Sequence, residues 1–127
     1  ESLPLFVFFP NVDASVQPSA QLMTAMKVPA DDERFIYPIL RNTLTQVDWS
    51  GRSAHVSGEV FIPPATGDVD QVWVAATAFD ELGHVVGVRR WEFGDTVVAG
   101  ASANFQITVA SLGPEIVAIS LGVEAKP

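Results

Sequence analysis

The sequence predicts an all-β protein, an antiparallel β-sandwich of about seven strands. Apolar and polar residues alternate with a period of two through much of the chain after Leu44, as half-buried strands require. Turn-forming residues separate these segments, and helix signals are scarce. At 127 residues the chain has room for one domain with a substantial core.

The first third of the chain differs from the rest. We expect residues 1–42 to form an N-terminal extension that packs on the sandwich, and residues 43–127 to form the sandwich itself. Leu3–Phe9 is an apolar run, and its prolines favour a short buried strand over a helix. Its large side chains would be sticky in water, so we expect it to dock at a sheet edge or on an apolar hairpin face.

Three further segments complete the extension. Pro18–Lys27 contains good helix formers and is predicted to be a short helix, although the same residues could pair as a strand. Ala30–Glu33 is acidic and favours a solvated loop; its carboxylates could also contribute to a calcium site, but the spacing of a calcium loop is missing. Phe35–Leu40 is apolar, and Pro38 restricts it to an edge, a bulge or a turn.

Regular strand signals follow. A strand is predicted over Thr43–Trp49, and a second over Ala54–Ile62, with polar residues on one face and apolar residues on the other. The apolar face of the second strand holds Ala54, Val56, Val60 and Ile62, and its polar face holds His55, Ser57 and Glu59. Pro63–Asp68 is predicted to be a loop.

Two strands are predicted near the C-terminus. The clearest alternation in the chain places four apolar residues on one face: Ala103, Phe105, Ile107 and Val109. Ile116–Val123 is apolar at both odd and even positions, which predicts an inner strand of a sheet.

A hairpin over Val69–Phe93 is predicted at the centre of the chain, because β-branched and aromatic residues stop at Asp80–Gly83 and then resume. A simple register about the turn places Trp73 opposite Trp91, and Phe79 opposite Val85, on one face. Each face of the hairpin is then substantially apolar, so one face must fill the core and the other would be exposed or covered by the N-terminal extension.

A one-residue bulge in the hairpin is the alternative. It would turn Trp91 and Phe93 into the core, beside Val72 and Val74. Core packing is the ordinary role of tryptophan, whereas a ligand or partner surface would consist of Trp73, Trp91 and Phe79. The sequence leaves this choice open.

Composition disfavours several functions. The net charge is −8, from 15 acidic and 7 basic residues, and no basic run offsets it, so binding of nucleic acid or anionic lipid is disfavoured. No apolar run is long enough for a membrane span. Cysteine is absent, which excludes disulfides, thiolate metal sites and thiol nucleophiles.

No constellation in the sequence indicates catalysis. His55 and His84 lack the spacing of metal ligands. Asp80, Glu81 and His84 gather at the hairpin tip, where a polar turn is the ordinary explanation and a metal site the alternative. Neither a nucleophile elbow nor a phosphate-binding glycine loop is present. We therefore predict a protein that is not an enzyme, with no catalytic residues, cofactor or metal.

The central and C-terminal strands also show a family resemblance. A Val-x-Val strand, an aromatic-Asp pair, a Gly-x-Val-Val-Gly return and an alternating Phe-x-Ile strand follow one another. The residues concerned are Val72, Val74, Phe79, Asp80, Gly83, Val86, Gly87, Gly100 and Phe105. From about Thr43 to Glu124 the chain resembles the FxLYD-type domains of bacterial extracytoplasmic proteins. The resemblance implies an immunoglobulin-like sandwich, without enzymatic activity and outside the cytoplasm, often within a larger surface protein or lipoprotein.

Two classes of function follow. The first is a structural or protein-interaction module on a bacterial cell surface, whose partner is another protein or a neighbouring domain of a longer chain. The second is a carbohydrate-binding module that uses exposed tryptophan faces. Solvent exposure of Trp49, Trp73 and Trp91 distinguishes the two, because a carbohydrate platform requires accessible rings.

Overall fold

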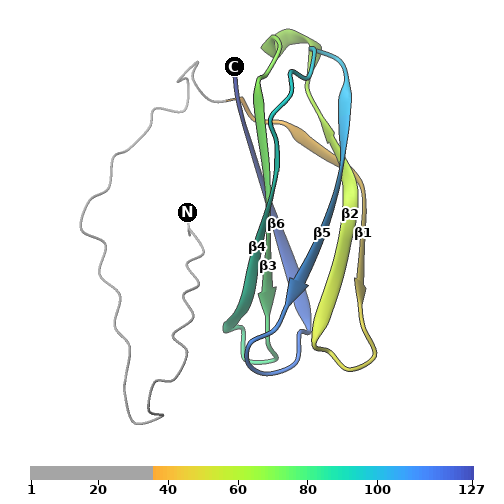
Figure 1. The fold of residues 1–127 in the computed structure, drawn as a ribbon, viewed down its shortest axis with the longest axis vertical. Coiled ribbons are helices and arrows are strands. Elements are labelled where there is room, and N and C mark those ends of the chain that lie inside the picture. The colour runs from red at the N-terminus through yellow and green to blue at the C-terminus, as the bar shows by residue number, and fades with distance from the viewer. Residues whose placement is uncertain (1–35) are drawn as a thin grey trace, which may run out of the picture.

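The computed structural model describes residues 36–127, which form two antiparallel sheets (Figure 1). The strand expected at Leu3–Phe9, the helix expected at Pro18–Lys27 and the acidic loop Ala30–Glu33 lie outside the described residues. The prediction of an all-β chain is confirmed for the part that the structure describes.

Each sheet has three strands. The first sheet has the order β1-β2-β5 and consists of β1 (Ile39–Val47), β2 (Ser53–Phe61) and β5 (Ser102–Ala110). The second has the order β4-β3-β6 and consists of β3 (Gln71–Phe79), β4 (Val85–Phe93) and β6 (Ala118–Lys126). A short 3-10 helix, η1 (Pro64–Thr66), lies in the predicted loop between β2 and β3. Six strands are thus described, and the count of about seven stays a prediction.

The core lies between the sheets and consists of the apolar faces of β2, β3 and β5. The alternation predicted for β2 and β5 is confirmed: every second residue of β5 is buried, and so are Ala54, Val56 and Val60 of β2. The largest fully buried side chains are Val56, Val60, Ile62, Val69, Val72, Val74, Phe105 and Val109. Period-two patterning therefore determines which face of each strand enters the core.

Strand β1 begins directly after Pro38 and lies at the edge of its sheet, as the proline predicts. A bulge interrupts its pairing with β2 between Arg41 and Leu44, where Asn42 has a positive φ of 52°. The strand starts before the predicted boundary between residues 42 and 43, so β1 continues across that boundary through the bulge.

The central hairpin contains the bulge that the sequence left open. Phe79 pairs with Val85, but the preceding Ala78 pairs with Gly87, so Val86 is an extra residue on β4. One extra residue moves every later side chain of β4 to the opposite face. The predicted pairing of Phe79 with Val85 is therefore confirmed, but beyond the bulge the simple register is wrong, and Trp73 pairs with Glu92.

The consequence of the bulge is clearest at the tryptophans. Val74, and not Trp73, lies opposite Trp91, which faces the core. The Trp91 ring stacks on Phe93, with 5.8 Å between ring centroids, and lies 6.1 Å from the Phe105 ring. The alternative with Trp91 and Phe93 at the core is confirmed.

Strand β6 departs from its prediction. We expected an inner strand, but among the described residues β6 pairs with a strand, β3, on one edge and with the single residue Ile36 on the other. Ile116 and Val117, which made the segment read as apolar on both faces, belong to the loop before the strand. Within β6 the outward-facing residues are small or polar: Ala118, Ser120, Gly122, Glu124 and Lys126.

Candidate functional site

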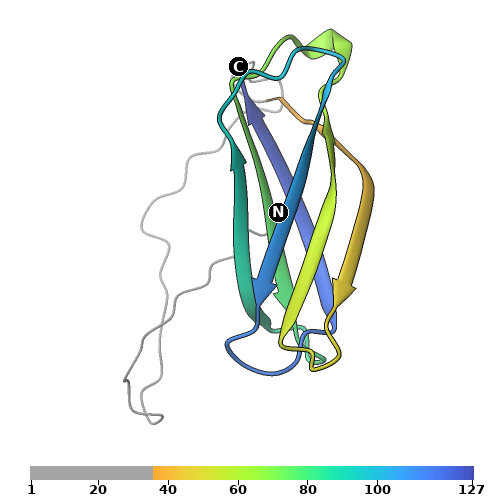
Figure 2. The ribbon, with the colours of Figure 1, turned by 45° about the vertical axis from the view of Figure 1, so that its right-hand side comes forward.

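Three connections meet at one end of the sandwich (Figures 1 and 2). They are the β1–β2 turn (48–52), the β3–β4 turn (80–84) and the β5–β6 loop (111–117). We call this surface the loop end. Loops held by a rigid sandwich are common binding surfaces, because the scaffold fixes their geometry.

Asp48 organises the β1–β2 turn. Its carboxylate accepts hydrogen bonds from the Ser50 amide at 2.8 Å, the Ser50 hydroxyl at 2.7 Å and the Ser53 hydroxyl at 2.7 Å. Its carbonyl accepts a bond from the Gly51 amide at 3.0 Å, and Gly51 adopts a positive φ of 68°. Side chain and backbone together thus fix the turn.

The hydrogen bonds to Asp48 also change its acidity. The hydroxyls of Ser50 and Ser53 are the largest causes, and they lower the pKa of Asp48 from 3.8 to about 2. The next residue, Trp49, is 99% exposed. A fixed turn therefore presents a complete indole ring to solvent.

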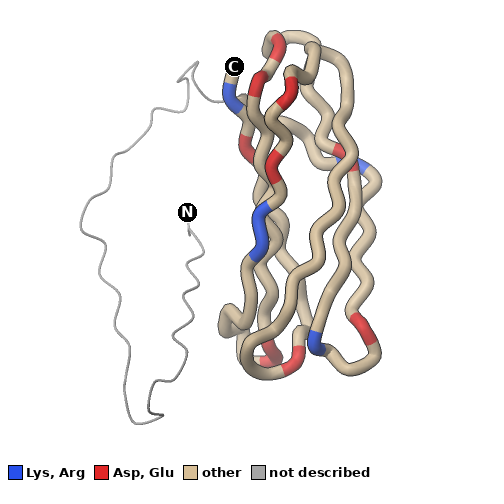
Figure 3. Tube along the Cα trace, in the orientation of Figure 1, with Lys and Arg blue, Asp and Glu red and all other residues tan. Residues whose placement is uncertain are grey.

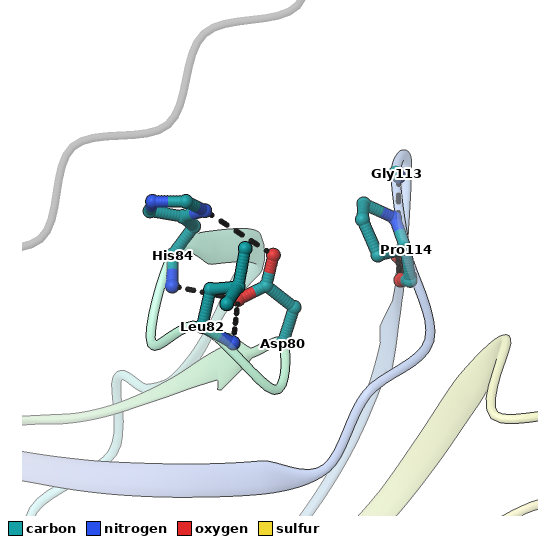
Figure 4. A network of polar contacts seen from close by, with 6 residues as sticks. Asp80, Leu82, His84, Gly113 and Pro114 are labelled. Carbon is teal, nitrogen blue, oxygen red and sulfur yellow. Dashed lines mark hydrogen bonds and ion pairs between the residues drawn. The ribbon is translucent and has the colours of Figure 1, made fainter.

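Asp80 has the same role in the β3–β4 turn (Figure 4). Although it is only 6% exposed, its carboxylate accepts hydrogen bonds from the amides of Leu82 at 2.9 Å and His84 at 2.8 Å. The His84 amide is the main cause of a lowered Asp80 pKa. The His84 ring lies 3.4 Å from the second carboxylate oxygen, and Leu82, at the tip, is 79% exposed.

The contacts of Asp80 bear on the hypothesis of a metal site at this tip. Both of its carboxylate oxygens face groups of the turn itself. Among residues 36–127, no group of three His, Asp or Glu side chains is arranged to hold a metal ion. Asp80 and His84 act as the polar turn that the sequence favours.

The β5–β6 loop connects the two turns. Toward the β1–β2 turn, the amides of Ser111 and Ile116 donate to the carbonyls of Arg52 and Gly51, both at 2.8 Å. Toward the hairpin, the amides of Leu112 and Val117 donate to the carbonyls of Val86 and Phe79, at 3.0 and 2.9 Å. The β5–β6 loop is therefore hydrogen-bonded to the β1–β2 turn and to the strand ends that flank the β3–β4 turn.

Each connection of the loop end exposes a large apolar side chain. Trp49 is 99% exposed, Leu82 79% and Leu112 55%. Acidic residues, including Glu81 and Glu115, lie in the same connections together with Arg52, and Figure 3 shows red segments and one blue segment at this end. The loop end thus combines exposed apolar side chains with a majority of acidic charges.

A shallow hollow of about 540 Å³ lies beside the β1–β2 turn. It is lined by the apolar residue Val47 and by residues with polar side chains: Gln46, Asp48, Ser53, His55 and Thr108. His55 Nδ1 lies 3.1 Å from the Thr108 hydroxyl. Asp48, which lines the hollow, is thus followed directly by the exposed indole of Trp49.

The predicted surface of Trp73, Trp91 and Phe79 does not form as one patch. Trp91 packs at the core, whereas Trp73 and Phe79 lie half-buried on the outer face of β3. Sequence reasoning did not single out Trp49 as a site. Its signal was the order Asp-Trp-Ser-Gly, in which an Asp at the first turn position and a Gly at the fourth leave the second side chain pointing outward.

No helix within residues 36–127 has the length and apolar character needed to cross a membrane. A comparison of the chain with models of known protein families, with curated proteins and with solved structures finds no match. The site therefore has to be interpreted from its own geometry.

Proposed function

We propose that this chain is a non-catalytic β-sandwich module with a structural or protein-interaction role, and that the loop end contacts the partner. The observation that carries the proposal is the exposure of Trp49, Leu82 and Leu112 on three connections at one end of the sandwich, where the β5–β6 loop is hydrogen-bonded to the β1–β2 turn and to the base of the hairpin tip. A backbone that is already held by hydrogen bonds loses less conformational entropy on binding, and tryptophan is a frequent anchor of protein interfaces.

The charges of the loop end support a protein partner. With a net charge of −8, the chain repels nucleic acid and anionic lipid. Asp48 and Asp80 direct their carboxylates into their own turns, so the apolar tips remain for contact. A partner with an apolar cleft bordered by basic residues fits this surface.

An immunoglobulin-like fold of about seven strands, outside the cytoplasm of a bacterium, forms part of the same proposal. The strand orders β1-β2-β5 and β4-β3-β6 support it, since the corresponding strands of an immunoglobulin domain share sheets in the same way. The resemblance to FxLYD-type domains supports the cell-surface location. A protease added to intact cells should then degrade the protein; degradation only after lysis would contradict the location.

Photo-cross-linking tests the contact surface. A photoreactive residue replaces Leu82 in cells that produce the protein, and the matched control replaces Gln106, which is exposed on the outer face of β5. We expect one defined cross-linked protein from position 82 and none from position 106, and loss of that product when Trp49→Ala is added. Cross-linking from both positions alike, or from neither, would contradict the proposal.

Carbohydrate binding is the second candidate, and the location of Trp49 favours it. The indole is fully accessible, and the adjacent residue Asp48 lines a polar hollow together with His55 and Thr108. Sugars bind by stacking on such rings while polar groups bond their hydroxyls. A glycan array measures this directly: binding that Trp49→Ala abolishes and Trp73→Ala preserves would establish it, and no binding by the unaltered protein would exclude it for the glycans tested.

A further inference from the structure

The second sheet has an incompletely paired edge at β6. Along one of its two edges, β6 pairs with β3 over its whole length, from Ala118 to Lys126. On the opposite edge, the described chain pairs at a single point, where Ile36 and Ala125 exchange two hydrogen bonds of 3.1 and 3.3 Å. The chain entering β1 therefore begins at the edge of β6.

The pairing at Ala125 identifies which other groups face this edge. Backbone N–H and C=O groups point to alternate sides along a strand, so those of Ile119, Leu121 and Val123 point the same way as those of Ala125. Pro38, two residues after Ile36, has no N–H to donate to the next position, and the chain then leaves for β1. On the edge opposite β3, no described residue pairs with β6 from Ile119 to Val123.

The side chains around this edge are also incompletely covered. Ile119, Leu121 and Val123 pack against the core but are only partly buried. In the opposite sheet, Val47 of β1 pairs with Ala54 of the neighbouring strand β2. Since Ala54 is buried, Val47 faces inward too, yet it is 41% exposed. An apolar strand at the edge of β6 would shield both sets of side chains.

We propose that Leu5–Phe9 of the same chain pairs with this edge and completes the second sheet. The segment has the same length as Ile119–Val123, and Pro4 and Pro10 end its capacity to pair. Its side chains are large and apolar in both orientations. On the outer face, the adjacent Ser120 and Gly122 are small and leave room for phenylalanine rings.

The same chain is a more favourable donor than a second copy. Ile36 already lies on the edge of β6, so the rest of the chain is tethered at the strand that the segment would join. Residues 10–35 form a connection several times longer than the edge itself, which permits either strand direction. Tethering gives the segment a high effective concentration at this site. This proposal rests on the unpaired edge of β6, and it does not depend on the function proposed for the loop end.

Amide hydrogen exchange, resolved by residue, tests the pairing. The amides of Ser120 and Gly122 point toward β3 and serve as internal controls for those of Ile119, Leu121 and Val123. In the full chain we expect both groups to be protected. In a chain lacking residues 1–10, the amides of Ile119, Leu121 and Val123 should exchange at least about tenfold faster, while the controls keep their protection.

A full-length variant keeps the test decisive if the shortened chain does not fold. Val7→Asp should have the same selective effect, because a charge within the apolar run opposes docking, whereas the control Val16→Asp should have none. Fast exchange at Leu121 in the unaltered chain overturns the proposal. So does protection that is found only in a dimer and lost on dilution to the monomer, which would identify a second copy as the donor.

Discussion

The two long sides of this sandwich are built differently. On the side of β4 and β5, the Trp91 ring, stacked on Phe93, packs against Phe105 of the other sheet, and Gly87 lets the strands approach closely. On the side of β1 and β6, the strand edges carry half-buried or exposed apolar residues such as Val47. The first is the closed side and the second the open side.

The difference shows that period-two patterning does not by itself close a sandwich. Both sides contain alternating strands, but closure also requires large rings that span the gap and a residue without a side chain where the backbones meet. A Cβ at Gly87 would collide with the carbonyl oxygen of Ala110 on β5. The open side has no such device among the described residues, and it is the side where we propose a further strand.

The largest effect is expected from removing the ring at the centre of the closed side. Phe105 is 1% exposed, and Phe105→Ala should lower the free energy of unfolding by about 3 to 5 kcal/mol, through lost burial and a cavity beside Trp91. Urea denaturation with fluorescence detection measures it. A loss below about 1 kcal/mol would mean that the closed side rearranges to fill the space.

Crowding the closed side should have the next largest effect. Gly87→Ala should lower the free energy of unfolding by about 1 to 3 kcal/mol, because the new methyl group meets backbone on β5. The matched control is Gly122→Ala on the open side, where an added Cβ has no neighbour within 4 Å. Equal destabilisation by both substitutions would contradict the distinction between the sides.

Acid should reduce the contribution of the β1–β2 turn to the free energy of unfolding. Since the folded-state pKa of Asp48 is lowered from 3.8 to about 2, its contribution to stability is complete above pH 3.8 and is lost as the pH falls through about 2. Asp48→Asn should flatten the dependence of unfolding free energy on pH in this window. Some dependence should remain from Asp80, whose pKa is also lowered. An unchanged slope in the variant would show that the hydrogen bonds to Asp48 are not maintained in solution.

The smallest effect is expected on the outer surface of the open side. Leu44 is 56% exposed on β1, so Leu44→Ala should change the free energy of unfolding by less than about 0.5 kcal/mol. Val56→Ala, on the adjacent strand β2 and fully buried, should cost more than about 1 kcal/mol. Thermal unfolding of the two variants measures both effects. A Leu44 variant as unstable as the Val56 variant would indicate that the outer face of β1 is covered.

Structural features that depend only on the local pattern of residues were predictable from the sequence. The alternation in β2 and β5 and the turn at Asp80–Gly83 needed no knowledge of distant contacts. The bulge at Val86 was predictable only as an alternative, because register depends on how the hairpin meets β5.

Features that depend on the ends of elements were missed. Apolar residues at 116 and 117 predicted an inner strand, yet both belong to the loop before β6, where Ile116 is buried by tertiary packing. The candidate site was missed for a related reason. Trp49, Leu82 and Leu112 are far apart in sequence, and only the hydrogen bonds of the β5–β6 loop place them on one surface.

The pairing of Ile36 with Ala125 has a mechanical consequence. These two residues are antiparallel neighbours near the end of the sandwich where the C-terminus lies, opposite the loop end (Figure 1). A force that pulls these two residues apart acts along their hydrogen bonds, and therefore perpendicular to the strands. Such a load unzips an antiparallel pair one bond at a time, at lower force than shearing would require. Tension between residue 36 and the C-terminus should therefore open this corner first, while the loop end at the far end stays folded.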